Sequence, residues 1–145
     1  MAYAEGRTFY DADSHIMELP DFLRDFADPG QRERLPSLSF GSGGRSALGV
    51  DEASRRGGQP PEKVAEMIAL GDDLISGPKG YQALGAFARD DRPAVLDMLG
   101  FRKQLVFSTF SAGMAFTVDK RIRYAATRAH NRGMADFCSV DDRLM

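Results

Sequence analysis

The hydrophobic positions of the chain fall into short strand-like runs and longer helix-like patterns. Thr8-Phe9-Tyr10 leads into a polar segment and predicts a strand over about residues 8–13. Leu105-Val106-Phe107 is a continuous apolar run, which predicts a strand buried on both faces, as in a parallel sheet. Strand, helix, strand and helix then follow one another along the chain, and this order predicts an α/β fold.

Four helices are predicted from apolar residues that recur every three to four positions. They begin after Asp21, Pro61, Asp90 and Asp119, and Gly100 is expected to end the third. The fourth is the longest, and its arginines are expected to form a solvated face. Its apolar face is expected to comprise Ile122, Ala125, Ala126, Ala129, Gly133 and Phe137.

Glycine and proline are concentrated between the first two of these helices. Residues 31–61 contain Gly41-Ser42-Gly43-Gly44 and Gly57-Gly58-Gln59-Pro60-Pro61. Such a composition marks loops. The sequence therefore predicts a flexible insertion at 31–61 within one domain that spans residues 1–145, and Gly41 to Gly58 are expected to be mobile.

The charge and cysteine content narrow the classes of partner. The net charge is −2 and the pI is about 5.7. This balance gives no electrostatic footprint for nucleic acid or an anionic membrane. Cys138 is the only cysteine, so no internal disulfide forms, and its thiol is expected to be buried and inert. The N-terminus lacks a signal-peptide pattern, and the chain is predicted to be cytoplasmic.

Asp13 and His15 are the strongest candidates for chemistry. Side chains two positions apart in a strand share a face, so this carboxylate and imidazole are expected to converge as metal ligands do. On spacing alone, a strand-end turn with a hydrogen-bonded histidine is the stronger interpretation. Asp11 is expected to be a turn residue or a supporting group near the site. For Glu18 a hydrogen bond near the site is one interpretation and a solvated surface position is the stronger one, and His130 is interpreted as structural.

Four segments together resemble the N-terminal part of the amidohydrolase-related family, the amidohydrolase 2 group. That group includes metal-dependent hydrolases and decarboxylases related to aminocarboxymuconate semialdehyde decarboxylase. The first segment runs from Asp11 to Asp21 and contains Asp11-Ala12-Asp13-Ser14-His15, and the second is Leu84-Gly85-Ala86-Phe87. The third runs from Val95 to Phe101 and continues into Gln104-Leu105-Val106-Phe107-Ser108. The fourth comprises Ala129-His130-Asn131-Arg132, Ala135-Asp136-Phe137-Cys138 and Asp142-Arg143-Leu144.

The resemblance implies a fold, a metal and a reaction class. The family fold is a (β/α)₈ TIM barrel of roughly 250 residues, so this chain is expected to be the N-terminal part of an incomplete barrel. Asp13 stands where the family usually has the first histidine of its metal motif, and His15 stands at the second. They imply a divalent metal, zinc or else manganese. The implied activity is hydrolysis of a cyclic amide or ester, or non-oxidative decarboxylation of a carboxylic acid.

Two alternatives remain open at this stage. The chain alone is expected to be inactive, because two ligands do not complete a catalytic zinc site. The first alternative is therefore a non-catalytic remnant or an interaction fragment that self-associates into a homo-oligomer. Asp11-Ala12-Asp13 is also similar to the Asp-x-Asp of haloacid dehalogenase-like phosphatases. That interpretation is weaker, because the preceding strand is short and His15 stands where a small hydroxyl residue is expected.

Overall fold

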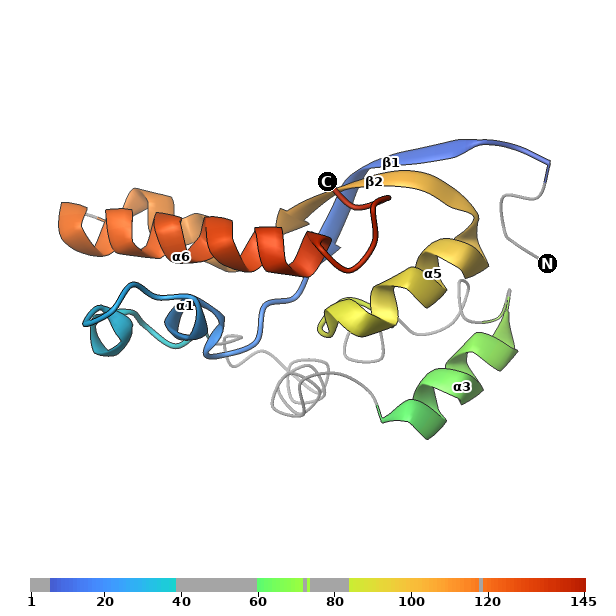
Figure 1. Ribbon diagram of the computed structural model, residues 1–145, viewed down its shortest axis with the longest axis horizontal. Helices are drawn as coiled ribbons and strands as arrows, with labels where there is room; N and C mark the ends of the chain where they lie inside the picture. The colour runs from blue at the N-terminus through green and yellow to red at the C-terminus, as the bar shows by residue number, and fades with distance from the viewer. Residues whose placement is uncertain (1–5, 39–59, 72, 74–83, 118) are drawn as a thin grey trace.

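The computed structural model describes residues 6–38, 60–71, 73, 84–117 and 119–145. Two strands, β1 (Phe9–Ile16) and β2 (Phe101–Ser108), pair in parallel. Figure 1 shows them running side by side, with α5 and α3 below them. The helices are α1 (Phe22–Asp25), α3 (Pro61–Leu70), α5 (Arg92–Leu99) and α6 (Lys120–Cys138), with 3₁₀ turns η1 (Arg32–Arg34), η2 (Arg89–Asp91) and η3 (Ser111–Phe116).

The prediction of a partial eight-stranded barrel is wrong. Among the described residues the sheet has two strands. A separate short bridge pairs Gln104 of β2 with Leu144 near the C-terminus. Closing a sheet into a barrel requires about eight tilted strands with a fixed stagger. A pair of strands cannot curve into such a wall, and the described residues form a small α/β unit in which helices pack on a parallel strand pair.

The register of the strand pair contains a β-bulge. Asp11 is opposite Gln104, but Ser14 is opposite Val106, so three steps along β1 match two along β2. The extra residue changes the phase of the alternation within β1. As a result Asp11 hydrogen-bonds the buried Gln104, whereas His15 lies against Phe107 on the opposite face.

The prediction that β2 is buried on both faces is wrong. Gln104 and Val106 are buried against the helices, but Leu105 and Phe107 are 41% and 42% exposed. The strand alternates as a half-buried strand does, because helices α5 and α6 pack on one side of it. The other side, which we call the open face, carries His15, Leu105 and Phe107.

Helix α6 follows the sequence prediction closely. The Asp119 carboxylate accepts hydrogen bonds from the amides of Arg121 and Ile122, at 2.8 and 3.4 Å, and so caps the helix. Gly133 lies where α6 meets α1, since a Cβ built there would approach Phe22 Cζ to 2.3 Å. The predicted apolar face is buried, apart from Ile122, which is partly buried beside the core.

The arginines of α6 are not simply a solvated face. Arg128 Nε and Arg132 Nη1 form ion pairs with the two oxygens of Asp28, at 2.6 and 2.9 Å. The hydrogen bond from Arg128 is the main reason that the pKa of Asp28 is lowered. These contacts fix the end of the α1 segment against α6.

The predicted insertion begins later than its composition suggests. Leu35 is 1% exposed and Leu38 is 7% exposed, and both belong to the main core. The amide of Leu38 also donates to the carbonyl of Pro20 at 2.7 Å. Leu35 and Leu38 are therefore packed in the core, while the predicted mobility of Gly41 to Gly58 concerns a span outside the described residues.

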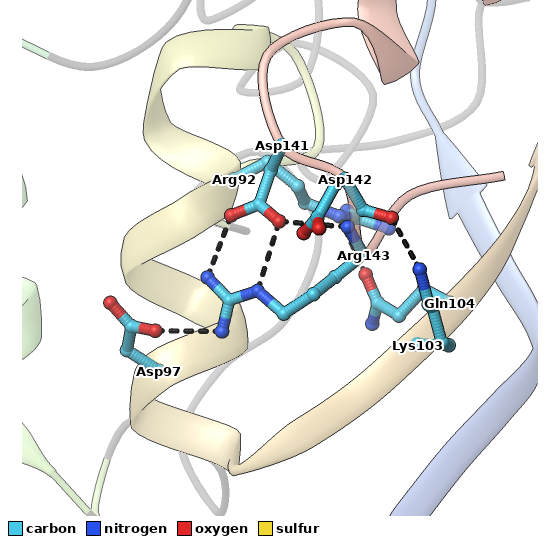
Figure 2. A network of polar contacts seen from close by, with 7 residues as sticks. All are labelled: Arg92, Asp97, Lys103, Gln104, Asp141, Asp142 and Arg143. Atoms are coloured by element: carbon cyan, nitrogen blue, oxygen red, sulfur yellow. Dashed lines mark hydrogen bonds and ion pairs between the residues drawn. The ribbon is translucent and has the colours of Figure 1, made fainter.

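The C-terminal residues lie along the outer edge of β2. The amide of Gln104 donates to Arg143, and the amides of Met145 and Val106 continue the parallel ladder at 2.9 and 2.8 Å. Figure 2 shows how side chains hold this segment: the Arg143 guanidinium bonds Asp141 at 2.7 Å and Asp97 of α5 at 2.7 Å. Hydrogen bonding to Asp141 raises the pKa of Arg143. The described sheet edge that remains unpaired is that of β1.

Candidate functional site at the carboxyl ends of the strands

Asp13 and His15 converge at the carboxyl end of β1, as their spacing predicts. Asp13 Oδ1 lies 3.4 Å from His15 Nε2. The Asp13 side chain is 93% exposed and that of His15 is 48% exposed. Asp11 does not join them, because its Oδ1 accepts the Asp13 amide at 3.0 Å and its Oδ2 accepts from Gln104 at 3.1 Å. Asp11 thus supports the Asp13 backbone, but the expected turn is wrong, because Phe9–Ile16 is a continuous strand.

Hydrogen bonds define which nitrogen of His15 carries the proton in its neutral form. Thr109 Oγ1 donates its single proton to the carbonyl of Ile16 at 2.6 Å. The contact of 3.4 Å between Thr109 Oγ1 and His15 Nδ1 must therefore have the ring as donor. Neutral His15 then directs the Nε2 lone pair toward the Asp13 carboxylate. In this tautomer two acceptors face each other and a metal ion could lie between them, whereas a proton on Nε2 would make the same contact an ion pair.

Glu18 is the main residue that sequence reasoning misjudged. It is 1% exposed and is not a solvated surface residue. Its carboxylate accepts the amides of Thr109, Phe110 and Ser111 at 2.8–3.2 Å, and the Ser111 hydroxyl at 2.7 Å. One side chain after β1 thus holds the whole turn after β2. No local pattern around Glu18 signals this, because its partners lie more than 90 residues away.

His130 joins the same cluster from helix α6. Its Nδ1 lies 2.8 Å from Ser111 Oγ. Burial lowers the pKa of His130, and the nearby Glu18 carboxylate acts in the opposite direction. His130 thus lies against the turn that follows β2, because η3 packs on α6.

A buried guanidinium lies beneath the site. Arg92 is 5% exposed, donates from Nε to Gln104 at 3.0 Å and from Nη1 to the Gly85 carbonyl at 3.0 Å, and also bonds Ser14 Oγ. Desolvation lowers its pKa, while the charge of Asp11 opposes this. Gln104 in turn bonds Asp11, so this network holds Asp11 and Ser14, the residues of β1 on either side of Asp13.

The described residues do not complete a metal site. No cluster of three or more His, Cys, Asp or Glu side chains able to hold a metal occurs within the described ranges. A cavity of about 270 Å³ lies between α1, α6 and residues 87–90, but neither Asp13 nor His15 lines it. Cys138 is partly buried, and burial raises the pKa of its thiol, as expected for an unreactive cysteine.

Comparison with known proteins adds no family to this picture. No protein-family model matches the chain, and no curated protein matches its sequence. In the part of the chain that the structure describes, no helix is both long and apolar enough to cross a membrane. The functional argument therefore rests on the geometry of the strand ends.

Proposed function

We propose that Asp13 and His15 are two ligands of a divalent metal, in a metal-dependent hydrolase or non-oxidative decarboxylase that acts on a small carboxylic acid, cyclic amide or ester. One observation carries the proposal: Asp13 Oδ1 and His15 Nε2 lie 3.4 Å apart. Two ligands of one tetrahedral zinc, with bonds of about 2.0–2.1 Å, lie about 3.3 Å apart. The exposure of both side chains leaves room for water and substrate.

The surroundings of the pair also fit a metal. His15 Nδ1 is occupied by Thr109, which fixes the tautomer that presents Nε2, as supporting hydrogen bonds do at metal centres. Nitrogen and oxygen donors suit zinc and also manganese. A bound metal would supply Lewis acidity and an activated water. In that reaction Asp13 and His15 bind, and Thr109 orients the ring. The resemblance of the first motif to amidohydrolase-related proteins supports the same class.

The first prediction concerns metal affinity. Titration calorimetry of the chain with zinc and with manganese should show weak binding that is lost in Asp13→Asn and His15→Gln. We expect each variant to lower the affinity at least tenfold, since loss of even a supporting partner costs roughly 10–100-fold. His130→Gln is the matched control, because this second histidine has no place in the pair. Equal affinity for zinc in the wild type and His15→Gln would refute the proposal.

With only two described ligands, the zinc-loaded chain is expected to show no turnover of amide, lactone or aromatic-acid substrates, because a catalytic zinc usually takes three protein ligands and a water. Turnover that chelator and His15→Gln both abolish would establish the reaction class and would contradict the expected inactivity of the chain alone.

A second candidate function is self-association through the open face. Leu105 and Phe107 are exposed on the same face as His15, whose ring centroid lies 5.8 Å from that of Phe107. A second copy docked there by two-fold symmetry would bring a second Asp13–His15 pair to the first. Two pairs supply four ligands, the number that a structural zinc site takes. In this case the chain acts as an interaction module and not as an enzyme.

The second prediction tests this module by sedimentation velocity. We expect a dimer that forms with zinc and dissociates with chelator, and whose formation is lost in Phe107→Lys and in His15→Gln. Tyr124→Lys is the control, because Tyr124 is 60% exposed on helix α6. A chain that binds zinc yet stays monomeric at all concentrations would exclude self-association and leave the two-ligand site in place.

A further inference from the structure

We propose that Glu18 and Ser111 are positioning residues that hold His130 in the Nδ1–H tautomer, so that its Nε2 is presented as a proton acceptor near the carboxyl end of β2. This inference deepens the proposed function by adding a base to it, but it rests on contacts that do not involve Asp13 or His15. It concerns three side chains linked by hydrogen bonds: Ser111 Oγ lies 2.7 Å from Glu18 Oε1 and 2.8 Å from His130 Nδ1.

The first step is the direction of the hydrogen bonds. The Glu18 carboxylate accepts three backbone amides, which can only donate, and it also accepts the hydroxyl of Ser111 at 2.7 Å. A serine hydroxyl carries one proton, and Glu18 takes it. Ser111 Oγ can then only accept from His130, so the ring proton lies on Nδ1.

The second step is what remains on the ring. With its proton on Nδ1, neutral His130 has a lone pair on Nε2, and no described residue contacts that atom by a hydrogen bond or an ion pair. His130 as a whole is only partly buried. The lowered pKa of the ring, which follows from its burial, keeps the lone pair free at neutral pH.

The third step is location. Thr109 and Ser111 belong to one turn after β2, and this turn connects both histidines to Glu18. His15 meets the turn through Thr109 and His130 meets it through Ser111. A general base needs reach to its proton and a pKa near the working pH. His130 has the features of such a base, because Nδ1 is hydrogen-bonded to Ser111 and Nε2 keeps its lone pair.

The test uses the fact that the chain contains two histidines. Long-range proton–nitrogen spectra of histidine-labelled protein report the tautomer of each ring. We expect His130 as Nδ1–H in the wild type, and a shift toward Nε2–H in Ser111→Ala with the His15 signals unchanged. His130 already in the Nε2–H form in the wild type would overturn the inference, even if Ser111→Ala fails to fold. An unchanged His130 tautomer in a folded Ser111→Ala protein would also overturn it.

A chemical probe separates this inference from the metal proposal. Diethyl pyrocarbonate acylates an unprotonated imidazole nitrogen, and mass spectrometry locates the modified residue. We expect His130 to react at a rate that excess zinc does not change, whereas zinc protects His15. If zinc protects neither histidine, the result counts against a metal site at Asp13 and His15 but not against the proposed role of His130. An unreactive His130 in the native protein would show that Nε2 is not available.

Discussion

Replacing Glu18 by alanine is expected to destabilise the protein by about 3–5 kcal/mol, the range observed when one partner of a buried charged interaction is removed. The Glu18 carboxylate is 1% exposed and accepts three amides and a hydroxyl. Alanine would leave these donors without partners in the interior, and each unsatisfied donor costs about 1–3 kcal/mol. Because domains are stable by only about 5–15 kcal/mol, the loss is a large share of the total.

Urea unfolding followed by circular dichroism measures this loss as a shift of the midpoint. Glu33→Ala provides the control, since Glu33 is exposed in η1 and its removal is expected to change stability by less than about 0.5 kcal/mol. Glu18→Gln keeps the size of the side chain but turns an amide group toward amide donors, so it should also destabilise. A Glu18→Ala protein within 1 kcal/mol of the wild type would mean that the turn after β2 does not depend on this carboxylate.

Valine at Gly133 is expected to cost about 3 kcal/mol, through a steric conflict and not through a lost bond. Even a Cβ at this position would approach three atoms of the Phe22 ring to 2.3–2.9 Å. Relieving the overlap requires α1 to move away from α6, and overpacking of this kind typically costs about 1–3 kcal/mol. Exposure of the Phe22 ring adds up to about 1.5–3 kcal/mol, while valine returns a few tenths through its better helix propensity.

Thermal unfolding compares Gly133→Val with Gly113→Val, because a Cβ at Gly113 meets no atom within 4 Å. The double variant Phe22→Ala with Gly133→Val should show strong coupling, since removal of the ring removes the conflict. Additive losses in that pair would show that the cost of valine arises elsewhere in the helix.

The elements of the chain were predictable where local chemistry specifies them. Asp119 caps α6, and Gly100 ends α5 with a φ of 76°, in the left-handed region where glycine is favoured. The strand pair is parallel, as predicted. The two-faced burial of β2 was not, because a three-residue apolar run does not reveal that Leu105 and Phe107 face outward. The expected barrel failed for a related reason: a likeness of local segments does not determine how many strands a sheet contains.

The candidate site was also only partly predictable from the sequence. The pair Asp13 and His15 could be read from an alternating pattern, and the structure brings the two side chains together. Whether they bind metal stays a prediction. The cluster of Glu18, Ser111 and His130 could not be read, because its members are 19 to 112 positions apart and each is ordinary in its local sequence. Long-range contacts between a loop, a turn and a helix create it.

The bulge in β1 has a consequence for how this sequence can vary in evolution. A regular strand would place Asp11, Asp13 and His15 on one face, and the extra residue between Asp11 and Ser14 separates the first from the other two. A single-codon deletion at Ala12 would remove the offset while leaving every named side chain in the protein. The shortened strand would keep Asp11 opposite Gln104 and His15 opposite Phe107 in an uninterrupted register. Loss of one residue in this stretch is therefore compatible with both contacts, because the bulge places Asp11 and His15 on the faces where a strand shorter by one residue would place them.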